Sequence, residues 1–212
     1  LTDLKSIAQL PGQGEKSEMW SSYDRKSKYD SASGEYINWS ANNDGFKPQY
    51  IREENGKHVL AEMEGPGAIV RIWSANPQDG NVKVYIDGEE QPVLDMPFKD
   101  FFSDNKEAFA FDELVYVTNA RGHNNYVPIS YQESCKIVAD PDWGQYYHFN
   151  YISFPKGTSV ESFSGLLDED NLEALAQVNR FFKDSLGHHP QPLSSTETEK
   201  VNMEIPAGES RQ

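Results

Sequence analysis

The feature that most constrains the fold is a series of short segments, between residues 48 and 155, in which apolar and polar residues alternate. Alternation with a period of two is typical of a half-buried β-strand, whereas a helix repeats every 3.6 residues. The clearest example is a hairpin, in which two alternating runs flank Asn55-Gly56, a dipeptide that favours a tight turn. Further strands are predicted at AIVRIWS, VKVYIDG, QPVLDM, ELVYV, NYVPISY, CKIVAD and QYYHFNYISF.

Turn signals separate most of these segments, at NPQDGN, DGEE, ARGHNN and DPDWG. Many short strands with regular turns, and without helical segments between them, indicate two packed antiparallel sheets. The sequence therefore predicts an all-β fold, an antiparallel β-sandwich of the jelly-roll kind, over residues 48–162. At 212 residues the chain is long enough to bury a core of that size.

Residues 163–187 depart from the alternating pattern and predict a bridging helix. Apolar residues recur there at intervals of three and four, which is a helical period, at Leu172, Leu175, Val178, Phe182 and Leu186. Asp168 is the expected N-cap and Gly187 the expected C-cap of a helix over 169–186. We expect the apolar stripe to pack on a sheet, because its burial would hold the helix firmly.

The end of the chain returns to alternation. Residues 188–198, HHPQPLSSTET, are predicted to be a linker. Residues 199–212 then place Val201, Met203 and Ile205 on one face, which predicts the first strand of a second jelly-roll domain that lies largely outside this chain.

Residues 1–47 form a polar region with many aromatic residues and little strand periodicity. Long irregular segments are often binding loops. Carboxylates and amides bind hydroxyl groups, and aromatic faces cover C–H surfaces, so this composition suits sugars. We expect the region to contribute to a functional site.

Charge and hydropathy exclude several classes of partner. The net charge of −15 would repel a phosphate backbone, so no nucleic-acid partner is expected. The mean hydropathy of −0.73, and the lack of an apolar run near 20 residues, argue against membrane insertion. A single cysteine fits the cytosol without excluding the periplasm. The chain starts at Leu1 without a leader, so we expect a processed periplasmic or secreted protein, with the cytoplasm as the alternative.

Motifs for common catalytic chemistry are missing. The sequence contains neither a G-x-S-x-G elbow, nor a Walker loop, nor H-E-x-x-H. Cys135 lies within a predicted strand and is expected to be a buried structural thiol. Two acidic triplets, at 140–142 and 168–170, are expected to be solvated loops rather than calcium sites. We therefore expect no metal and no cofactor.

One stretch, AEMEGPGAIVRIWSANP, allows a sharper interpretation. Glu62 and Glu64 stand two apart, as the paired carboxylates of a glycosidase would on one strand. The alternative is a solvent-facing edge with Ala61 and Met63 turned to the core, in which Arg71 pairs with one of the glutamates. The residues between them, 65–67, are most simply a tight turn.

Several long motifs together resemble one family. SSYDR, NNDG, AEMEGPGAIVRIWSANP, VKVYIDGEEQP, YVPISYQESCKI and YYHFNYISFPKGT occur in this order. The chain resembles the first half of glycoside hydrolase family 172, which includes α-D-fructofuranosidases, such as the difructose dianhydride I synthase/hydrolase, and enzymes that release α-D-arabinofuranose. The resemblance runs from about residue 20 to about residue 158.

The resemblance implies a protomer of two jelly rolls that assembles into homotrimers or larger oligomers. It implies a retaining α-D-furanosidase whose two catalytic glutamates lie beyond Gln212, in the second half of the protein or in a companion chain. Glu62 and Glu64 then become framework or substrate-contact residues. The expected substrate is an oligosaccharide or glycan with α-D-fructofuranoside or α-D-arabinofuranoside units; the alternative is a non-catalytic carbohydrate-binding or structural module. The substrate-contact candidates are Asp24, Arg25, Trp39, Asn43, Asp44, Glu64 and Arg71.

Overall fold

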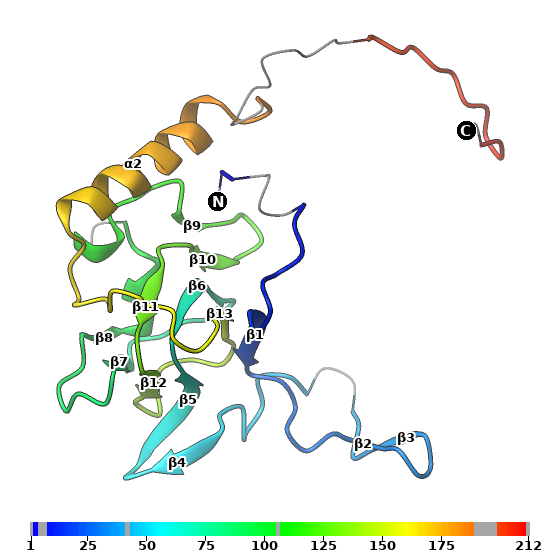
Figure 1. Cartoon of the computed structure of the whole chain (residues 1–212). Coiled ribbons are helices and arrows are strands. Elements are labelled where there is room, and N and C mark those ends of the chain that lie inside the picture. Colours follow the sequence, from blue (N-terminus) through cyan, green and yellow to red (C-terminus); the bar gives the residue numbers. More distant parts are fainter. Residues whose placement is uncertain (1, 4–7, 41–42, 105–106, 189–198, 211–212) are drawn as a thin grey trace.

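Two antiparallel sheets form the body of the protein (Figure 1). The computed structural model describes residues 2–3, 8–40, 43–104, 107–188 and 199–210. The first sheet has the order β1 (Lys16–Ser21), β13 (His148–Ser153), β6 (Gly67–Ser74), β10 (His123–Asn125) and β9 (Val115–Val117), and β11 (Ile129–Tyr131) also pairs with β6. The second sheet has the order β4 (Arg52–Glu54), β5 (Lys57–Glu64), β12 (Ser134–Ala139), β7 (Asn81–Ile86) and β8 (Leu94–Pro97).

The order of the strands is that of a jelly roll. Late strands lie between early ones in both sheets, since β13 separates β1 from β6 and β12 separates β5 from β7. The chain crosses between the sheets at the β5–β6 turn and again between β12 and β13. Greek-key connections produce this interleaving. The antiparallel β-sandwich predicted from the alternating segments is confirmed.

The predicted turns at both ends of β5 are also present. Asn55 and Gly56 both have positive φ, of 49° and 74°, as a two-residue type I′ hairpin turn requires. At the other end, Gly67 opens β6, where a Cβ atom would lie 2.5 Å from the Tyr131 hydroxyl. The glycine is therefore needed for the close packing of β6 on β11.

Aromatic side chains dominate the core between the sheets. Its largest fully buried members include Trp143, Tyr131, Tyr147, Phe98, Phe101, Phe109 and Phe149. Three of them belong to two short 3-10 helices that the sequence did not predict, η1 (Phe98–Phe102) and η2 (Glu107–Phe109). The Phe98 ring meets Trp143 edge-on, with ring centroids 5.8 Å apart. Each such ring removes a large apolar area from water, so these helices close one end of the core.

An irregularity in β6 sets which side chains leave the core. The β6–β13 register shifts because Asn150 pairs with Arg71 whereas the next residue, Tyr151, pairs with Ile69. One extra residue, Val70, therefore stands on β6 as a bulge, and the alternation changes phase across it. Ile69 and Ile72 both reach the core, and Arg71 and the residue after Ile72 point to the opposite face.

The described part of residues 1–47 contains more regular structure than predicted. Residues 16–21 form β1, which pairs along its whole length with β13 at the edge of the first sheet. The Trp20 indole donates a 2.8 Å hydrogen bond to the Glu62 carbonyl on β5, which ties the two sheets together. A separate hairpin of β2 (Lys28–Asp30) and β3 (Glu35–Ile37) projects from the body (Figure 1). The expectation of an irregular segment is therefore wrong for β1, whose polar and mostly exposed side chains hide the strand period.

Helix α2 (Glu169–Asp184) begins as predicted and ends two residues early. Its N-cap Asp168 accepts a 2.7 Å hydrogen bond from the Asn171 backbone N–H. The C-cap is Ser185, so the prediction that Gly187 caps the helix is wrong. Gly187 lies just beyond, with a φ of 87°.

The predicted packing of the apolar stripe of α2 is present in part. Polar contacts also hold the helix to the segment that follows η2: Asn179 accepts from the Glu113 backbone N–H at 2.9 Å, and Lys183 pairs with Asp112 at 2.9 Å. Part of the predicted stripe, Leu175, Val178 and Phe182, is only half-buried against the core, and Leu172 is 41% exposed. Polar anchors as well as apolar burial therefore hold this helix.

Residues 199–210 contain no strand, and their side chains are exposed. A strand forms only beside a partner, so the assignment of residues 199–212 to a second jelly roll stays a prediction. Of the predicted linker, residues 188–198, only His188 belongs to the described residues. Within the described part of the chain, no helix is both long and apolar enough to span a membrane.

Candidate functional site

The outer face of the first sheet gathers polar and aromatic side chains. Residues directly opposite each other on paired strands share a face, and the pairs Arg71–Asn150, Trp73–His148, Trp73–Asn124 and Asn124–Tyr116 run across four strands. The neighbouring pair Ile72–Phe149 is fully buried in the core, so the first set points outward. We call this set, with Tyr126 beside it, the polar face: Arg71, Trp73, Tyr116, Asn124, Tyr126, His148 and Asn150.

Arg71 occupies the centre of the polar face. Its two terminal nitrogens donate to the Asn124 amide oxygen at 3.2 Å and the Asn150 amide oxygen at 3.5 Å. The guanidinium also lies over the Tyr126 ring, 5.8 Å from its centroid. Its Nε atom is buried and has no hydrogen-bond partner. The predicted pairing of Arg71 with a glutamate is wrong, because Glu62 lies in the second sheet and is bound to other cations.

Trp73 and His148 form the aromatic part of the face. Their rings lie 4.7 Å apart at 33°. Burial lowers the pKa of His148 below its usual 6.5, the positive charge of Arg71 lowers it further, and the carboxylate of Asp44 opposes the change. The lowered pKa favours the neutral imidazole of His148 at neutral pH.

The loop with the predicted contact residues borders this face. The Asp24 backbone N–H donates to the Asp44 carboxylate at 2.9 Å, and the Asp24 carboxylate accepts from the Lys26 backbone N–H at 3.0 Å. The Gly45 N–H donates to the Ser22 carbonyl at 2.7 Å, directly after β1. The Ser22 backbone N–H in turn donates to the carbonyl of Tyr147 at 3.2 Å, directly before His148, so the loop and the polar face are neighbours. The second carboxylate oxygen of Asp24 is buried without a hydrogen-bond partner.

Arg25 is engaged in the fold rather than held toward solvent. One terminal nitrogen donates to the Ser21 carbonyl at 2.8 Å and to the Tyr147 hydroxyl at 3.2 Å. Tyr147 is fully buried, and its hydroxyl donates a hydrogen bond to the Leu60 carbonyl at 2.8 Å. Arg25 therefore ties the loop to both sheets, and its guanidinium covers the exposed Tyr23 ring at 4.4 Å.

The remaining candidates are more dispersed. Asn43 is half-buried, next to Asp44, and its carbonyl accepts from the Phe46 N–H at 3.2 Å. Trp39 follows β3 and is 65% exposed. Glu64 ends β5 in the second sheet, where its side chain is exposed. The structure thus brings Asp24, Asn43 and Asp44 together in one loop, whereas Arg71 lies on β6 of the first sheet and Glu64 on β5 of the second.

Glu62 and Glu64 do not form an available carboxylate pair. Ala61 and Met63 are buried, as the solvent-face interpretation predicted. The Glu62 carboxylate accepts hydrogen bonds from both terminal nitrogens of Arg52 at 2.5 Å, and the Lys136 ammonium lies 3.7 Å away. These contacts hold the pKa of Glu62 below its usual value, with the Arg52 hydrogen bond as the main cause. A carboxylate fixed in this way supports the second sheet.

Other chemical groups offer little. Cys135 is buried in β12, and burial raises the pKa of its thiol to about 12, so the predicted structural role is confirmed. Across the described ranges, no cluster of three or more histidine, cysteine or acidic side chains is arranged to hold a metal ion.

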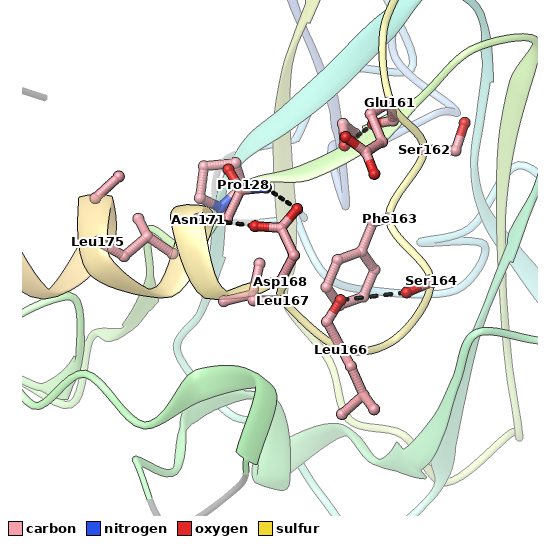
Figure 2. A pocket seen from close by; sticks show the side chains of 12 residues that line it. Pro128, Glu161, Ser162, Phe163, Ser164, Leu166, Leu167, Asp168, Asn171 and Leu175 are labelled. Atoms are coloured by element: carbon pink, nitrogen blue, oxygen red, sulfur yellow. Dashed lines mark hydrogen bonds between the residues drawn. The ribbon is translucent and has the colours of Figure 1, made fainter.

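A cavity of about 210 Å³ separates α2 from the segment of residues 161–168 (Figure 2). Its most central carboxylate, Asp168, accepts from both the backbone N–H and the side-chain amide of Asn171, at 2.7 and 2.8 Å. Figure 2 shows this pair at the start of the helix. The carboxylate is committed to the helix cap, and we assign no chemistry to the cavity.

Of the polar face, only Arg71 was predicted from the sequence, and the other six residues were missed: Trp73, Tyr116, Asn124, Tyr126, His148 and Asn150. Their signal was present, because His148 and Asn150 stand two apart in a strand pattern, as Arg71 and Trp73 do. Alternation alone does not show which polar side chains the register of the strands brings together. As a set, a cation, two amides, a neutral imidazole and an indole can bind hydroxyl groups and cover a C–H surface.

Comparison with known proteins identifies one family. A family model described as "GH172 first beta-sandwich domain" matches residues 13–171. No curated protein matches the chain. The matched range begins before β1 and ends within α2, so it covers both sheets and the loop of Asp24 and Asp44.

Proposed function

Because the chain belongs to glycoside hydrolase family 172, we propose that it forms part of a retaining hydrolase of α-D-furanosides, with the catalytic glutamates outside this chain. The observation that carries the proposal is the placement of Arg71 between two amides, beside Trp73 and the Asp44 loop. This combination of groups suits a hydroxyl-rich ring.

In the proposed complex, each part of the face has a separate task. Arg71 and the Asn124 and Asn150 amides hold the hydroxyl groups of the furanose ring, and Trp73 covers one of its C–H faces. The Asp44 carboxylate accepts hydrogen bonds from further hydroxyls. The cleavage itself needs a nucleophile and an acid/base, which form and hydrolyse a furanosyl-enzyme intermediate.

Selectivity would rest on the hydroxyl contacts. A five-membered ring has no chair to distort, so binding must discriminate by pairing each hydroxyl with a partner. A site built in this way rejects analogues that leave its buried polar groups unpaired. α-D-Fructofuranose and α-D-arabinofuranose share much of their hydroxyl arrangement, and we propose that one of these two is the substrate.

The fixed carboxylates of the second sheet favour one alternative, a non-catalytic carbohydrate-binding module. Glu62 is bound by Arg52, Glu54 by Lys136 at 2.6 Å, and Asp95 is paired with Lys83 at 2.5 Å. None of these three is free to attack a glycosidic bond, and in this alternative the chain binds sugar and leaves it intact. The two proposals differ in whether a second domain or chain supplies the glutamates.

The deciding experiment is incubation of the full-length protein with p-nitrophenyl α-D-arabinofuranoside and with difructose dianhydride I. Release of sugar from either substrate, and its loss in Arg71→Ala, is the expected result. Binding of the sugars without release would support the non-catalytic alternative. Light scattering after size-exclusion chromatography tests the further proposal of a homotrimer or larger oligomer, and cell fractionation tests the proposed periplasmic or secreted location.

A further inference from the structure

A groove of about 570 Å³ lies at one end of the sandwich, next to the Asp44 loop. Three connections form it: the segment before β4, the β6–β7 loop and the β12–β13 loop. Its volume is within the range of small-molecule sites. We call it the end groove and define it by six of its lining residues: Phe46, Gln49, Asn76, Gln78, Asp142 and Gln145.

Close backbone contacts hold two of these connections together. The Gln78 N–H donates to the Trp143 carbonyl at 2.8 Å, and the Gly80 N–H donates to the Asp142 carbonyl at 3.1 Å. A Cβ atom on Gly144 would lie 2.4 Å from the Asn76 carbonyl oxygen. Beneath them, Trp143 is fully buried and donates to His58 at 3.1 Å. The groove is therefore shaped by a fixed frame.

The lining of the end groove favours a hydroxyl-rich ligand. Four of its ten lining residues carry amide side chains, each of which can donate and accept hydrogen bonds, and one basic and two acidic side chains stand beside them. The Gln78 amide already donates to Asn76 at 2.7 Å, so the two side chains form a ready pair. Phe46 is 57% exposed and offers an aromatic face. Amides beside an exposed ring are suited to a pyranose or furanose.

Gln49 provides an independent sign of a ligand. It is only 5% exposed, lines the groove, and its amide oxygen is buried without a hydrogen-bond partner. Buried acceptors are rarely left in this state, because the loss of their hydrogen bond to water is uncompensated. A ligand hydroxyl that reaches the floor of the groove would supply the donor.

The end groove continues the polar face along the same two strands. Trp73 and His148 lie in the face, and one or two residues further along each strand the Ser74 hydroxyl donates to the Tyr146 carbonyl at 2.6 Å. Tyr146 in turn packs on Gly45, where a Cβ atom would lie 2.3 Å from its ring. We propose that the end groove binds the part of an oligosaccharide that adjoins the furanosyl unit. This inference rests on the proposed function, since it extends the same substrate.

The test compares a short and a long probe on the full-length protein. The probes are p-nitrophenyl α-D-arabinofuranoside and an α-D-arabinofuranosyl tetrasaccharide, and the variants are Phe46→Ala and Gln78→Ala. In both variants we expect kcat/KM on the tetrasaccharide to fall about tenfold more than kcat/KM on the short probe. The Kd of the tetrasaccharide, measured by calorimetry, should rise about tenfold. Tyr29→Ala, an equally exposed aromatic on the projecting hairpin, is the control and should change neither.

The outcomes separate this inference from the proposed function. Equal losses of kcat/KM on both probes, or no loss on either, would contradict the binding role proposed for the end groove. Failure of the wild-type protein to bind the tetrasaccharide would contradict it as well. If wild-type protein binds the tetrasaccharide without cleaving it, and the two variants lose that binding, the end groove stands and the hydrolase proposal fails.

Gln49→Met separates a ligand contact from a structural one. Methionine has nearly the same shape and removes the unsatisfied oxygen, so the melting temperature should stay level or rise, while tetrasaccharide binding weakens. A clear drop in melting temperature with unchanged tetrasaccharide binding would mean that water satisfies the oxygen, and would contradict the role given to Gln49.

Discussion

Asp24 and Asp44 are joined by a 2.9 Å hydrogen bond from the backbone N–H of the first to the carboxylate of the second, although they are 20 positions apart. The chain between them contains the projecting β2–β3 hairpin (Figure 1), so this bond closes the base of a long excursion beside the polar face. The Asp44 carboxylate therefore shapes the loop, and in the proposed complex it also binds the sugar.

Replacement of either aspartate should affect activity more than folding. For Asp24→Ala and Asp44→Ala in the full-length enzyme we expect a loss of roughly ten- to a hundredfold in kcat/KM, the equivalent of one charged hydrogen bond of about 1.5 to 3 kcal/mol. Asp44→Asn keeps an acceptor for the Asp24 N–H and should lose less. Kinetics run beside thermal melts provide the measurement. Earlier unfolding with normal turnover per folded molecule would assign both residues to the fold.

Replacement of Arg25 should affect folding more than activity. Arg25→Ala removes the donor to the Ser21 carbonyl and to the Tyr147 hydroxyl, which lie in partly buried surroundings. We expect it to lower the free energy of unfolding by about 1 to 3 kcal/mol, measured by urea denaturation. Lys26→Ala, the exposed neighbour, should stay within about 0.5 kcal/mol. A stable Arg25→Ala protein with lost activity would return Arg25 to the substrate contacts.

The body of the sandwich could be predicted because strand alternation and turn chemistry are local signals. Each predicted strand between residues 52 and 153 corresponds to an observed one, and Asn55-Gly56 makes the turn expected of it. The predicted turn ARGHNN is wrong at its end, where His123–Asn125 form β10. The edge strand β1 could not be found in this way, because an edge strand with exposed side chains on both faces has no apolar period. Its place depends on pairing with β13, at the far end of the chain.

The candidate site was only partly predictable for a related reason. The loop residues stood out by composition, but the polar face is assembled from β6, β9, β10 and β13 through register. The bulge at Val70 decides that Arg71 leaves the core while Ile69 and Ile72 enter it. A bulge has no reliable signature in a single sequence, so the residues that meet at the face follow from the fold alone.

His58 should make stability depend on pH. Its ring accepts the Trp143 indole N–H at 3.1 Å and stacks on Tyr50 with centroids 3.8 Å apart. Burial, helped by the charge of Lys47, lowers its pKa below 6.5 in the folded protein. The unfolded chain then binds more protons as pH falls through 6.5, so stability should drop from that point down to the folded pKa. Urea denaturation at pH 7.5, 6.5 and 5.5 measures this.

His58→Gln is the matched control, because its amide oxygen can still accept from Trp143 but does not titrate. Its unfolding free energy should be lower throughout and vary less with pH than that of the wild type. His148 titrates in the same window and remains in both proteins, so the difference between them isolates His58. Parallel pH profiles for the two proteins would contradict the prediction.

Asp87 should be a strong determinant of stability. Its carboxylate accepts from the backbone N–H groups of Glu133 at 2.6 Å and Ser134 at 3.0 Å, and from the Ser162 hydroxyl. Burial opposes ionisation, but these hydrogen bonds hold the pKa of Asp87 below its usual value. Its φ is 54°, which asparagine and glycine tolerate better than alanine.

We expect Asp87→Ala to cost about 2 to 4 kcal/mol of unfolding free energy, and Asp87→Asn clearly less, since asparagine keeps one acceptor oxygen and the backbone preference. Asp87→Gly removes the backbone strain but does not restore the lost acceptor oxygens. Its loss of unfolding free energy should therefore lie between those of the alanine and asparagine variants. Equal losses in the alanine and asparagine variants would mean that the charge alone accounts for the stabilisation.

The pKa of His148 should report the geometry of the polar face independently of any activity. Arg71 lowers this pKa and Asp44 raises it, after the main effect of burial. Arg71→Met removes a neighbouring positive charge, so protonation of the imidazole becomes easier and the pKa should rise toward 6.5. Asp44→Asn removes the opposing negative charge, so the pKa should fall further. NMR titration of the His148 ring protons in the three proteins measures both shifts. If neither variant moved the titration, or both moved it in one direction, His148 would not lie between the two charges, and the loop of Asp44 would not border the proposed sugar site.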